Sequence, residues 1–106
     1  MNRKDFVNLN RLGKRFHTGH FTLLYAENTL GIRRLGITVS KRIGKAVIRN
    51  RVKRLTREFY RLHKAYAPQG YDIVIAAKKG AGDLDFRKIK EELGEFFLDK
   101  QIGVSP

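Results

Sequence analysis

The sequence predicts an α/β or α+β sandwich, in which helices pack against a small mixed sheet. Short apolar runs with a period of two predict strands, and two longer segments with a helical period predict amphipathic helices. At 106 residues, 42% of them hydrophobic, the chain is large enough for one modest core. We therefore expect a single domain over residues 1–106. Its order would be helix, strand, strand, helix, strand, helix, either as it stands or with one strand split in two.

The first two elements follow from the N-terminal residues. Residues 3–12 predict a short helix, with Phe6 and Leu9 on one side and Gly13 as its C-cap. Residues 20–26 predict a strand whose alternate side chains fall on opposite faces. One face would contain Phe21, Leu23 and Tyr25, and the other Thr22 and Leu24.

A turn over residues 27–34, which contains Asn28 and Gly31, leads to a second strand over residues 35–40. Apolar and small or polar residues alternate along this strand, so we expect it to be half-buried. Its apolar side chains are Leu35, Ile37 and Val39, and its other face contains Gly36, Thr38 and Ser40. The face with Gly36, Thr38 and Ser40 would continue the face with Thr22 and Leu24. The side chains of this combined sheet face are too polar and too small for an ordinary core.

The longest predicted element is a helix over residues 45–66, which Pro68 and Gly70 would end. Its apolar residues recur in alternating steps of four and three, a pattern typical of an amphipathic helix. This stripe should supply much of the core, and it consists of Ile48, Val52, Leu55, Phe59, Leu62 and Tyr66.

The last third of the chain completes the sandwich. Residues 71–77 are rich in strand-forming residues and predict a central strand. A loop over residues 78–84 precedes a final helix, for which Asp85 is the expected N-cap. The buried side of that helix would contain Phe86, Ile89, Leu93, Phe96 and Phe97.

Positive charge dominates the composition. Lys and Arg number 23 against 10 Asp and Glu, which gives a formal net charge of +13. Residues 40–64 contain ten Lys or Arg and one acid, Glu58, whereas the charges of residues 82–100 nearly balance. Because the charge is concentrated rather than spread evenly, the sequence predicts a polyanionic partner, and a nucleic acid is the usual one.

Several other classes of protein are disfavoured. There is no cysteine, which excludes a disulfide scaffold and a thiolate zinc site, and the three scattered histidines lack the spacing of metal ligands. No apolar run approaches the roughly 20 residues needed to cross a bilayer, and no signal peptide opens the chain. We expect a cytoplasmic protein without membrane attachment and without a metal site in the protein alone.

The cations of the long helix form a row beside its apolar stripe and extend round the remaining arc of the helix. At roughly 100° per residue, a row of basic side chains runs beside the apolar stripe: Arg49, Lys53, Arg57 and Arg61. Further basic and polar residues widen this surface, namely Ser40, Lys41, Arg42, Lys45, Asn50, Arg51 and Arg54. Arginine binds phosphate with two parallel hydrogen bonds, and an amide can contact bases or 2′-hydroxyls. A merely solvated helix face is the alternative, but Glu58 is the only acid on this helix to pair with so many cations.

The order of these residues matches a known pattern. Residues 36–57 read GITVSKRIGKAVIRNRVKRLTR, with an RNR triplet at residues 49–51. This segment resembles the signature of the bacterial ribonuclease P protein family. The resemblance covers nearly the whole chain, from the DF pair at residues 5–6 through the YDIVI run at residues 71–75 to the last helix.

The resemblance implies a particular fold. It would be an α+β sandwich of order αβββαβα, with a small mixed four-stranded sheet and about three helices, similar to the second domain of ribosomal protein S5. The family's strand-helix-strand crossover is left-handed, whereas such a unit is right-handed by default. Sequence patterns alone do not indicate this handedness.

The resemblance also implies a function. The family's catalyst is a large RNA, and the ribonucleoprotein removes the 5′ leader of precursor tRNA. Mg²⁺ ions held mainly by the RNA take part in the reaction, and the protein has no catalytic residue of its own. The protein would be a monomer bound 1:1 to the ribonuclease P RNA, and it would assist binding of leader-bearing precursor tRNA.

Two surfaces follow from the resemblance, residue by residue. The surface for the catalytic RNA would comprise Ser40, Lys41, Arg42, Lys45, Arg49, Asn50, Arg51 and Arg54. The cleft for the leader, between the first helix and the open sheet face, would comprise Phe6, Thr22, Leu24, Thr38, Arg49, Lys53 and Arg57. Phe6 would either stack on an unpaired base, worth roughly 1–3 kcal/mol, or only pack the helix. Relatives often have further aromatics where this chain has Leu9 or Asn10, and Leu24, so leader stacking would be weaker or rearranged.

Other functions fit parts of the sequence. A ribosomal-type RNA scaffold would explain the charge and the long helix, but not the ordered signature. A self-sufficient nuclease would need clustered carboxylates or a histidine pair, and a helix-turn-helix protein would need a short helix packed across the basic one. A membrane-surface helix would fit the amphipathic pattern but not the strands.

Overall fold

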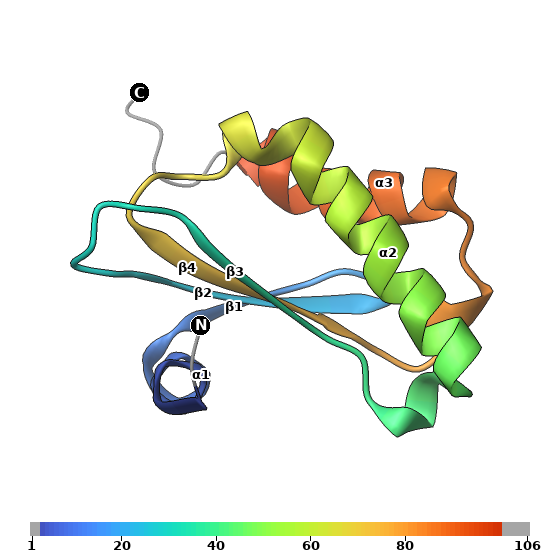
Figure 1. The fold of residues 1–106 in the computed structure, drawn as a ribbon. Helices are drawn as coiled ribbons and strands as arrows, with labels where there is room; N and C mark the ends of the chain where they lie inside the picture. The colour runs from blue at the N-terminus through green and yellow to red at the C-terminus, as the bar shows by residue number, and fades with distance from the viewer. Residues whose placement is uncertain (1–2, 101–106) are drawn as a thin grey trace.

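A four-stranded mixed sheet forms the centre of the fold, and the element order is the αβββαβα order expected (Figure 1). The computed structural model describes residues 3–100, without the side chains of residues 3, 5, 6, 99 and 100. The strands are β1 (Lys14–His17), β2 (Phe21–Glu27), β3 (Arg34–Thr38) and β4 (Tyr71–Ala77). Their order in the sheet is β1-β2-β4-β3, with β4 antiparallel to β2 and parallel to β3.

Helices cover both faces of this sheet (Figure 1). One face is covered by α1 (Arg3–Leu12), and the other by α2 (Ala46–His63) and α3 (Phe86–Gly94), which pack against each other. Short 3-10 turns connect these elements: η1 (Lys41–Ile43), η2 (Lys64–Tyr66) and η3 (Ala81–Asp83). A π-helical segment, η4 (Glu95–Lys100), extends α3. The left-handed crossover between β3 and β4 stays a prediction.

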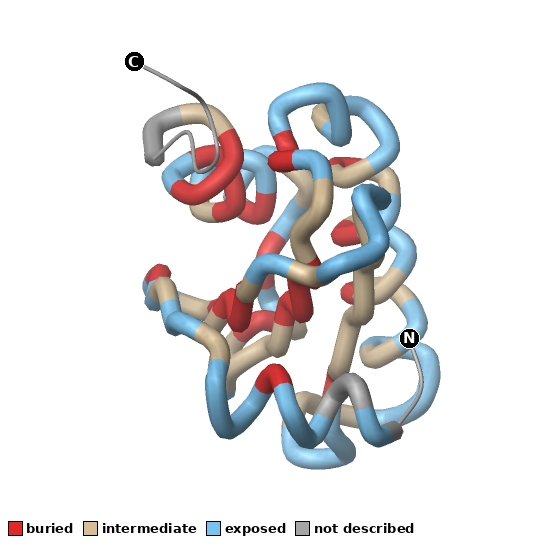
Figure 2. The backbone as a smooth tube through the Cα atoms, turned by 90° about the vertical axis from the view of Figure 1, so that its left-hand side faces the viewer, coloured by how far each residue is buried: buried red, intermediate tan, exposed pale blue. Residues whose placement is uncertain are grey.

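The main core lies between the sheet and the α2–α3 layer, where Figure 2 shows the buried segments in red. The strand faces predicted to be apolar meet there and contribute Phe21, Leu23, Tyr25, Ile73 and Ile75. The helical layer contributes Val52, Phe59, Ile89, Leu93, Phe96 and Phe97. Asp85 caps α3 as expected, because its carboxylate accepts a hydrogen bond from the Lys88 amide at 2.9 Å.

The buried side of α2 differs from the predicted stripe. Val52 and Phe59 are fully buried, but Ile48, Leu62 and Tyr66 are 38%, 52% and 55% exposed. A seven-residue pattern drifts by about 20° per repeat on a straight α-helix, so its members do not all face the sheet. Tyr66 lies beyond α2, in the tighter turn η2. Thr56, absent from the prediction, is fully buried, and its hydroxyl is satisfied there because it donates to the Val52 carbonyl at 2.7 Å.

The strand β1 was not predicted from the sequence patterns. Its four residues are exposed except for the half-buried Phe16, so it shows little apolar alternation. It pairs with β2 at the edge of the sheet, with Lys14 opposite Tyr25 and His17 opposite Thr22. Charged residues on an edge strand oppose further strand pairing, which explains a polar sequence at this place.

Candidate nucleic-acid interface

The basic surface predicted on α2 is accessible. Arg49 and Arg51 are half-buried, and the remaining members of the predicted RNA surface are exposed: Ser40, Lys41, Arg42, Lys45, Asn50 and Arg54. Of the cations on α2 predicted for the leader cleft alone, Lys53 is half-buried and Arg57 is exposed. Glu58, the acid of α2, pairs instead with Arg61 at 2.6 Å. Among the side chains that the structure describes, no acid lies within ion-pair distance of the predicted RNA-surface cations. The positive field of this surface is therefore not neutralised by the protein itself.

The turn η1 presents the residues that precede α2. The amide of Ile43 donates to the Ser40 carbonyl at 3.1 Å, and the amide of Gly44 donates to the Lys41 carbonyl at 3.3 Å. The segment closes on itself through these bonds and leaves the Lys41 and Arg42 side chains exposed. The chain then enters α2 with no acidic residue in its first turn.

The side chains of two arginines of α2 lie partly inside the protein. The Nε of Arg49 is buried and has no hydrogen-bond partner within the described residues. An unsatisfied buried donor destabilises by about 1–3 kcal/mol, so an acceptor supplied by a ligand would be favourable here. Arg51 donates from Nη1 to the Gly82 carbonyl oxygen at 3.2 Å, which ties α2 to η3.

The face of the sheet that is turned away from α2 and α3, and that α1 covers in part, consists of three cross-strand rows of residues. Thr22 and Thr38 both pair with Ala76 of β4, so these three residues form one row across β2, β4 and β3. The next two rows are Leu24–Val74–Gly36 and Ala26–Asp72–Arg34. The structure thus brings Thr22 and Thr38 of the predicted leader cleft onto the same face of the sheet, with Ala76 between them.

The middle row is covered rather than open. Leu9 of α1 packs with Leu24 and Val74 in a second, small core, in which Leu24 is only 6% exposed. The exposed remainder of α1 appears pale blue in Figure 2. Phe6, also predicted for the cleft, belongs to α1, but its side chain lies outside the described residues.

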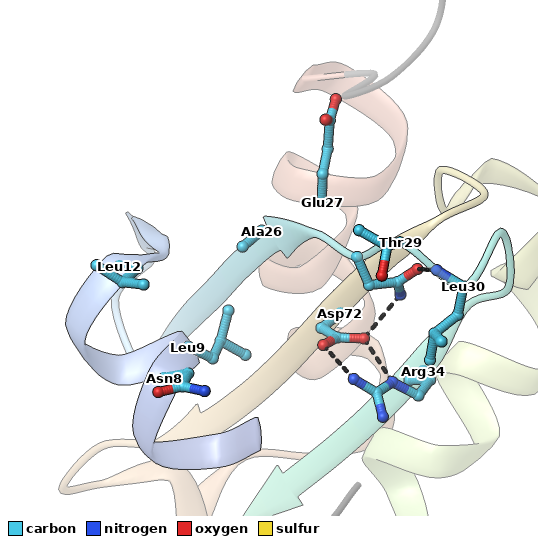
Figure 3. Close-up of a pocket in the computed structure, with 10 residues that line it drawn as sticks. Asn8, Leu9, Leu12, Ala26, Glu27, Thr29, Leu30, Arg34 and Asp72 are labelled. Carbon is cyan, nitrogen blue, oxygen red and sulfur yellow. Dashed lines mark hydrogen bonds and ion pairs between the residues drawn. The ribbon is translucent and has the colours of Figure 1, made fainter. Parts of the chain in front are cut away.

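A pocket of about 470 Å³ adjoins the third row, between α1, β2 and the connection to β3 (Figure 3). Asp72 lies at this pocket and accepts two hydrogen bonds from Arg34, at 2.8 and 2.7 Å, and one from Asn28 at 2.8 Å. The bonds from Arg34 lower the pKa of Asp72 despite its burial, and that from Asn28 adds to the effect. None of the predicted leader-cleft residues whose side chains are described lines this pocket.

Sequence patterns did not point to Lys78 and Lys79, which follow β4. In the structure they line a pocket together with Ser40 and Arg42. The strands β3 and β4 are parallel neighbours, so their C-terminal ends lie together and the residues that follow both strands are close in space. Parallel pairing of these two strands is the signal from which the proximity could have been predicted.

Neither a metal cluster nor a membrane span was found in the described part of the chain. Among the side chains that the structure describes, no group of three or more His, Cys, Asp or Glu could hold a metal ion. None of the helices described is long and apolar enough to cross a membrane.

The fold and the surface define a class: a small basic α+β protein with one unneutralised cationic helix face, as is typical of nucleic-acid-binding proteins. A family model described as Ribonuclease P matches residues 1–101. The ribonuclease P protein component of Geotalea uraniireducens is 47% identical over 94 residues, which cover 88% of this chain and 81% of that protein. That of Syntrophus aciditrophicus is 46% identical over 92 residues, with 87% and 77% covered.

Solved structures agree with this match. The RNase P protein of Staphylococcus aureus superposes with a TM-score of 0.86 at 30% identity, covering 99% of this chain and 95% of that one. The RNase P protein of Thermotoga maritima, solved in complex with 1-(4-fluorophenyl)-2-thiourea, has a TM-score of 0.83 at 35% identity, with 90% and 92% covered. The chain therefore belongs to the bacterial ribonuclease P protein family.

Proposed function

We propose that this chain is the protein subunit of a ribonuclease P ribonucleoprotein, which cleaves precursor tRNA in the cytoplasm to release the 5′ leader. Membership of the family supports the assignment. The observation that carries it is the basic surface of η1 and α2, whose cations other than Arg61 have no acidic partner among the described side chains. Such a surface is suited to the phosphates of a large RNA.

In this proposal the catalytic RNA lies against the surface from Ser40 to Arg54, as a 1:1 complex with a protein monomer. Exposed Lys41, Arg42 and Arg54 would neutralise phosphates, and the exposed amide of Asn50 would contact bases or 2′-hydroxyls. The protein supplies no catalytic residue. It contributes binding energy and neutralises charge that otherwise opposes folding of the RNA.

The 5′ leader of precursor tRNA would bind along the α1 face of the sheet. The Thr22–Ala76–Thr38 row provides a small, polar floor on which an extended single strand could lie. Arg49, Lys53 and Arg57 lie on α2, which covers the other face of the sheet, so they would contact the leader's phosphates where the leader passes the edge strand β3. Because Leu9 covers Leu24, we expect the leader to lie over the threonine row and not over the middle of the sheet.

Mg²⁺ is required in this proposal, but not at a site within the protein. The described residues contain no cluster of carboxylates or histidines that fits a divalent cation. The ions would be held mainly by the RNA, where they stabilise charge during phosphodiester hydrolysis. The protein's part is to lower the Mg²⁺ concentration at which the complex is active.

Reconstitution tests the proposal. The protein would be added to a bacterial ribonuclease P RNA at low Mg²⁺, and 5′ cleavage followed on precursor tRNA with a long or a very short leader. We expect the protein to restore cleavage and to favour the long leader. Tight RNA binding without any stimulation of cleavage would contradict the proposal and favour a ribosomal-type scaffold.

A further inference from the structure

A second cationic site lies beside the predicted RNA surface. A pocket of about 490 Å³ opens where the connection after β3 approaches the end of β4. It is lined by Ser40, Arg42, Ile43, Ala77, Lys78 and Lys79. Three of these six residues are cations and none is an acid. Arg42 and Lys79 are exposed, and neither has an acidic partner among the described side chains.

The lysine-bearing side of this pocket is anchored to the turn between β1 and β2. The backbone amide of Lys78 donates to the His20 carbonyl at 2.8 Å. The Nζ of Lys78 donates to the Thr18 carbonyl, also at 2.8 Å. An ammonium group has three donors, so two remain for a ligand after this bond. Lys78 is therefore positioned before any ligand binds.

The two sides of the pocket are held together by direct contact between loops. A Cβ atom at Gly82 would lie 2.7 Å from Cγ2 of Ile48 and 3.2 Å from the carbonyl oxygen of Ile43. The backbone of η3 thus touches both η1 and the start of α2. The Arg51–Gly82 hydrogen bond adds a second link between the same segments. The backbone segments that bear these cations, more than 30 residues apart in sequence, are therefore held side by side.

We propose that this pocket binds one phosphate of the RNA subunit's backbone. Arg42 and Lys79 would supply opposing positive charges, Lys78 its two remaining donors, and Ser40 a hydroxyl donor. A phosphodiester of RNA is favoured over an isolated anion because the pocket is continuous with the η1–α2 surface through Ser40 and Arg42. This inference rests on the proposed function and extends the RNA interface to Lys78 and Lys79.

Salt-dependent binding to ribonuclease P RNA tests the site. The association constant of wild type, Lys79→Ala and Lys90→Ala would be measured across a range of salt concentrations. Lys90 is an exposed residue of α3 outside both surfaces, so its variant removes the same charge elsewhere. We expect Lys79→Ala alone to reduce the slope of log K against log salt by about one. If both variants bind like wild type, the site does not contact RNA.

A double-mutant cycle between Arg42→Ala and Lys79→Ala tests whether the two cations share a phosphate. Residues that contact one group are coupled, so the combined loss should be clearly different from the sum of the single losses. Strictly additive losses would place the two residues at separate phosphates and overturn the single site. Failure of wild type itself to bind the RNA would instead contradict the proposed function. Saturable micromolar binding of inorganic phosphate to the free wild-type protein, absent in Lys79→Ala, together with unchanged RNA binding by that variant, would overturn the assignment to RNA.

Discussion

Arg51 donates a hydrogen bond from Nη1 to the carbonyl oxygen of Gly82, 3.2 Å away, and so joins the basic helix α2 to the loop that follows β4. Arg51 is thus part of the proposed RNA surface and also a link within the protein. A guanidinium group has five N–H donors, so most remain available to RNA. The residues that would bind phosphate are in this way connected to the loop that bears Lys78 and Lys79.

Replacing Arg51 should therefore affect both stability and RNA binding. We expect Arg51→Ala to lower the free energy of unfolding by about 0.5–1.5 kcal/mol, the usual contribution of one such hydrogen bond, and to weaken RNA binding. Arg54→Ala, at an exposed neighbour on α2, should weaken RNA binding but change stability by less than about 0.5 kcal/mol. Urea unfolding and RNA titration measure the two effects. Equal stabilities of the two variants would contradict the structural role of Arg51.

The contact of Gly82 with η1 leaves no room for a side chain. In Gly82→Ala the new Cβ would meet Ile48 Cγ2 at 2.7 Å, so η3 and α2 would have to move apart. We expect destabilisation of about 1–3 kcal/mol, as for other overpacked sites. Gly19→Ala is the matched control, because the atoms nearest to its Cβ would belong to the Glu92 carboxylate, at an ordinary contact distance of 3.6 Å. Similar thermal unfolding of both variants would show that the loops are not in close contact.

Glu92 connects α3 to the turn between β1 and β2. Its carboxylate accepts hydrogen bonds from Thr18 Oγ1 at 2.7 Å and from the His20 amide at 2.6 Å, and it lies 2.6 Å from His20 Nδ1. Burial acts to raise the pKa of Glu92, but the hydrogen bonds from Thr18 and His20 outweigh it and lower the pKa below 4.5. The ionised form is therefore the one that stabilises the fold.

A lowered folded-state pKa makes this stabilisation pH-dependent. It is fully present above the unfolded-state pKa, about 4.5, and is lost as the pH falls through the lower folded-state value. We expect Glu92→Gln to be about 1.5–3 kcal/mol less stable than wild type at pH 7. Below about pH 4 the difference should shrink. Urea unfolding across this range measures it, and a difference that stays constant with pH would contradict the account.

Lys53 provides a test of the leader cleft. If it contacts a leader phosphate, Lys53→Ala should weaken binding of long-leader precursor tRNA by the holoenzyme by about 1 kcal/mol, or roughly fivefold. Binding of tRNA without a leader should not change. Lys64→Ala, which removes an exposed lysine beyond α2, serves as the charge-matched control. Equal losses for substrates with and without a leader would exclude this role of Lys53.

The sequence predicted those parts of the fold that depend on local patterns. The bounds of α1 and β4, the apolar faces of β2 and β3, and the Asp85 cap agree with the structure. The strand β1 was missed because an exposed edge strand needs no apolar alternation. The exposure of Ile48 and Leu62 was missed because the spacing of apolar residues does not show which part of the apolar side of a helix contacts the sheet.

Long-range neighbours were harder to predict. Thr22 and Thr38 were each expected on a polar sheet face, but their position on either side of Ala76 depends on β4 lying between β2 and β3. The cover of Leu9 over Leu24 likewise depends on how α1 crosses the sheet. Lys78 and Lys79 lie in a loop without any periodic pattern, and only the parallel pairing of β3 with β4 brings them to Ser40 and Arg42.

The central claim is that the basic face of α2 lets a ribonuclease P RNA work at low Mg²⁺. The most direct measurement is the rate of 5′-leader cleavage at low Mg²⁺ with wild type and two doubly substituted proteins of equal charge. Arg49→Ala/Arg51→Ala removes two cations from α2, and Arg87→Ala/Lys90→Ala removes two exposed cations from α3. The account predicts that wild type and the α3 variant restore cleavage, and that the α2 variant does not, although it remains folded. Equal stimulation by both variants would mean that net charge, and not this face of the helix, supports the RNA, and would contradict the claim.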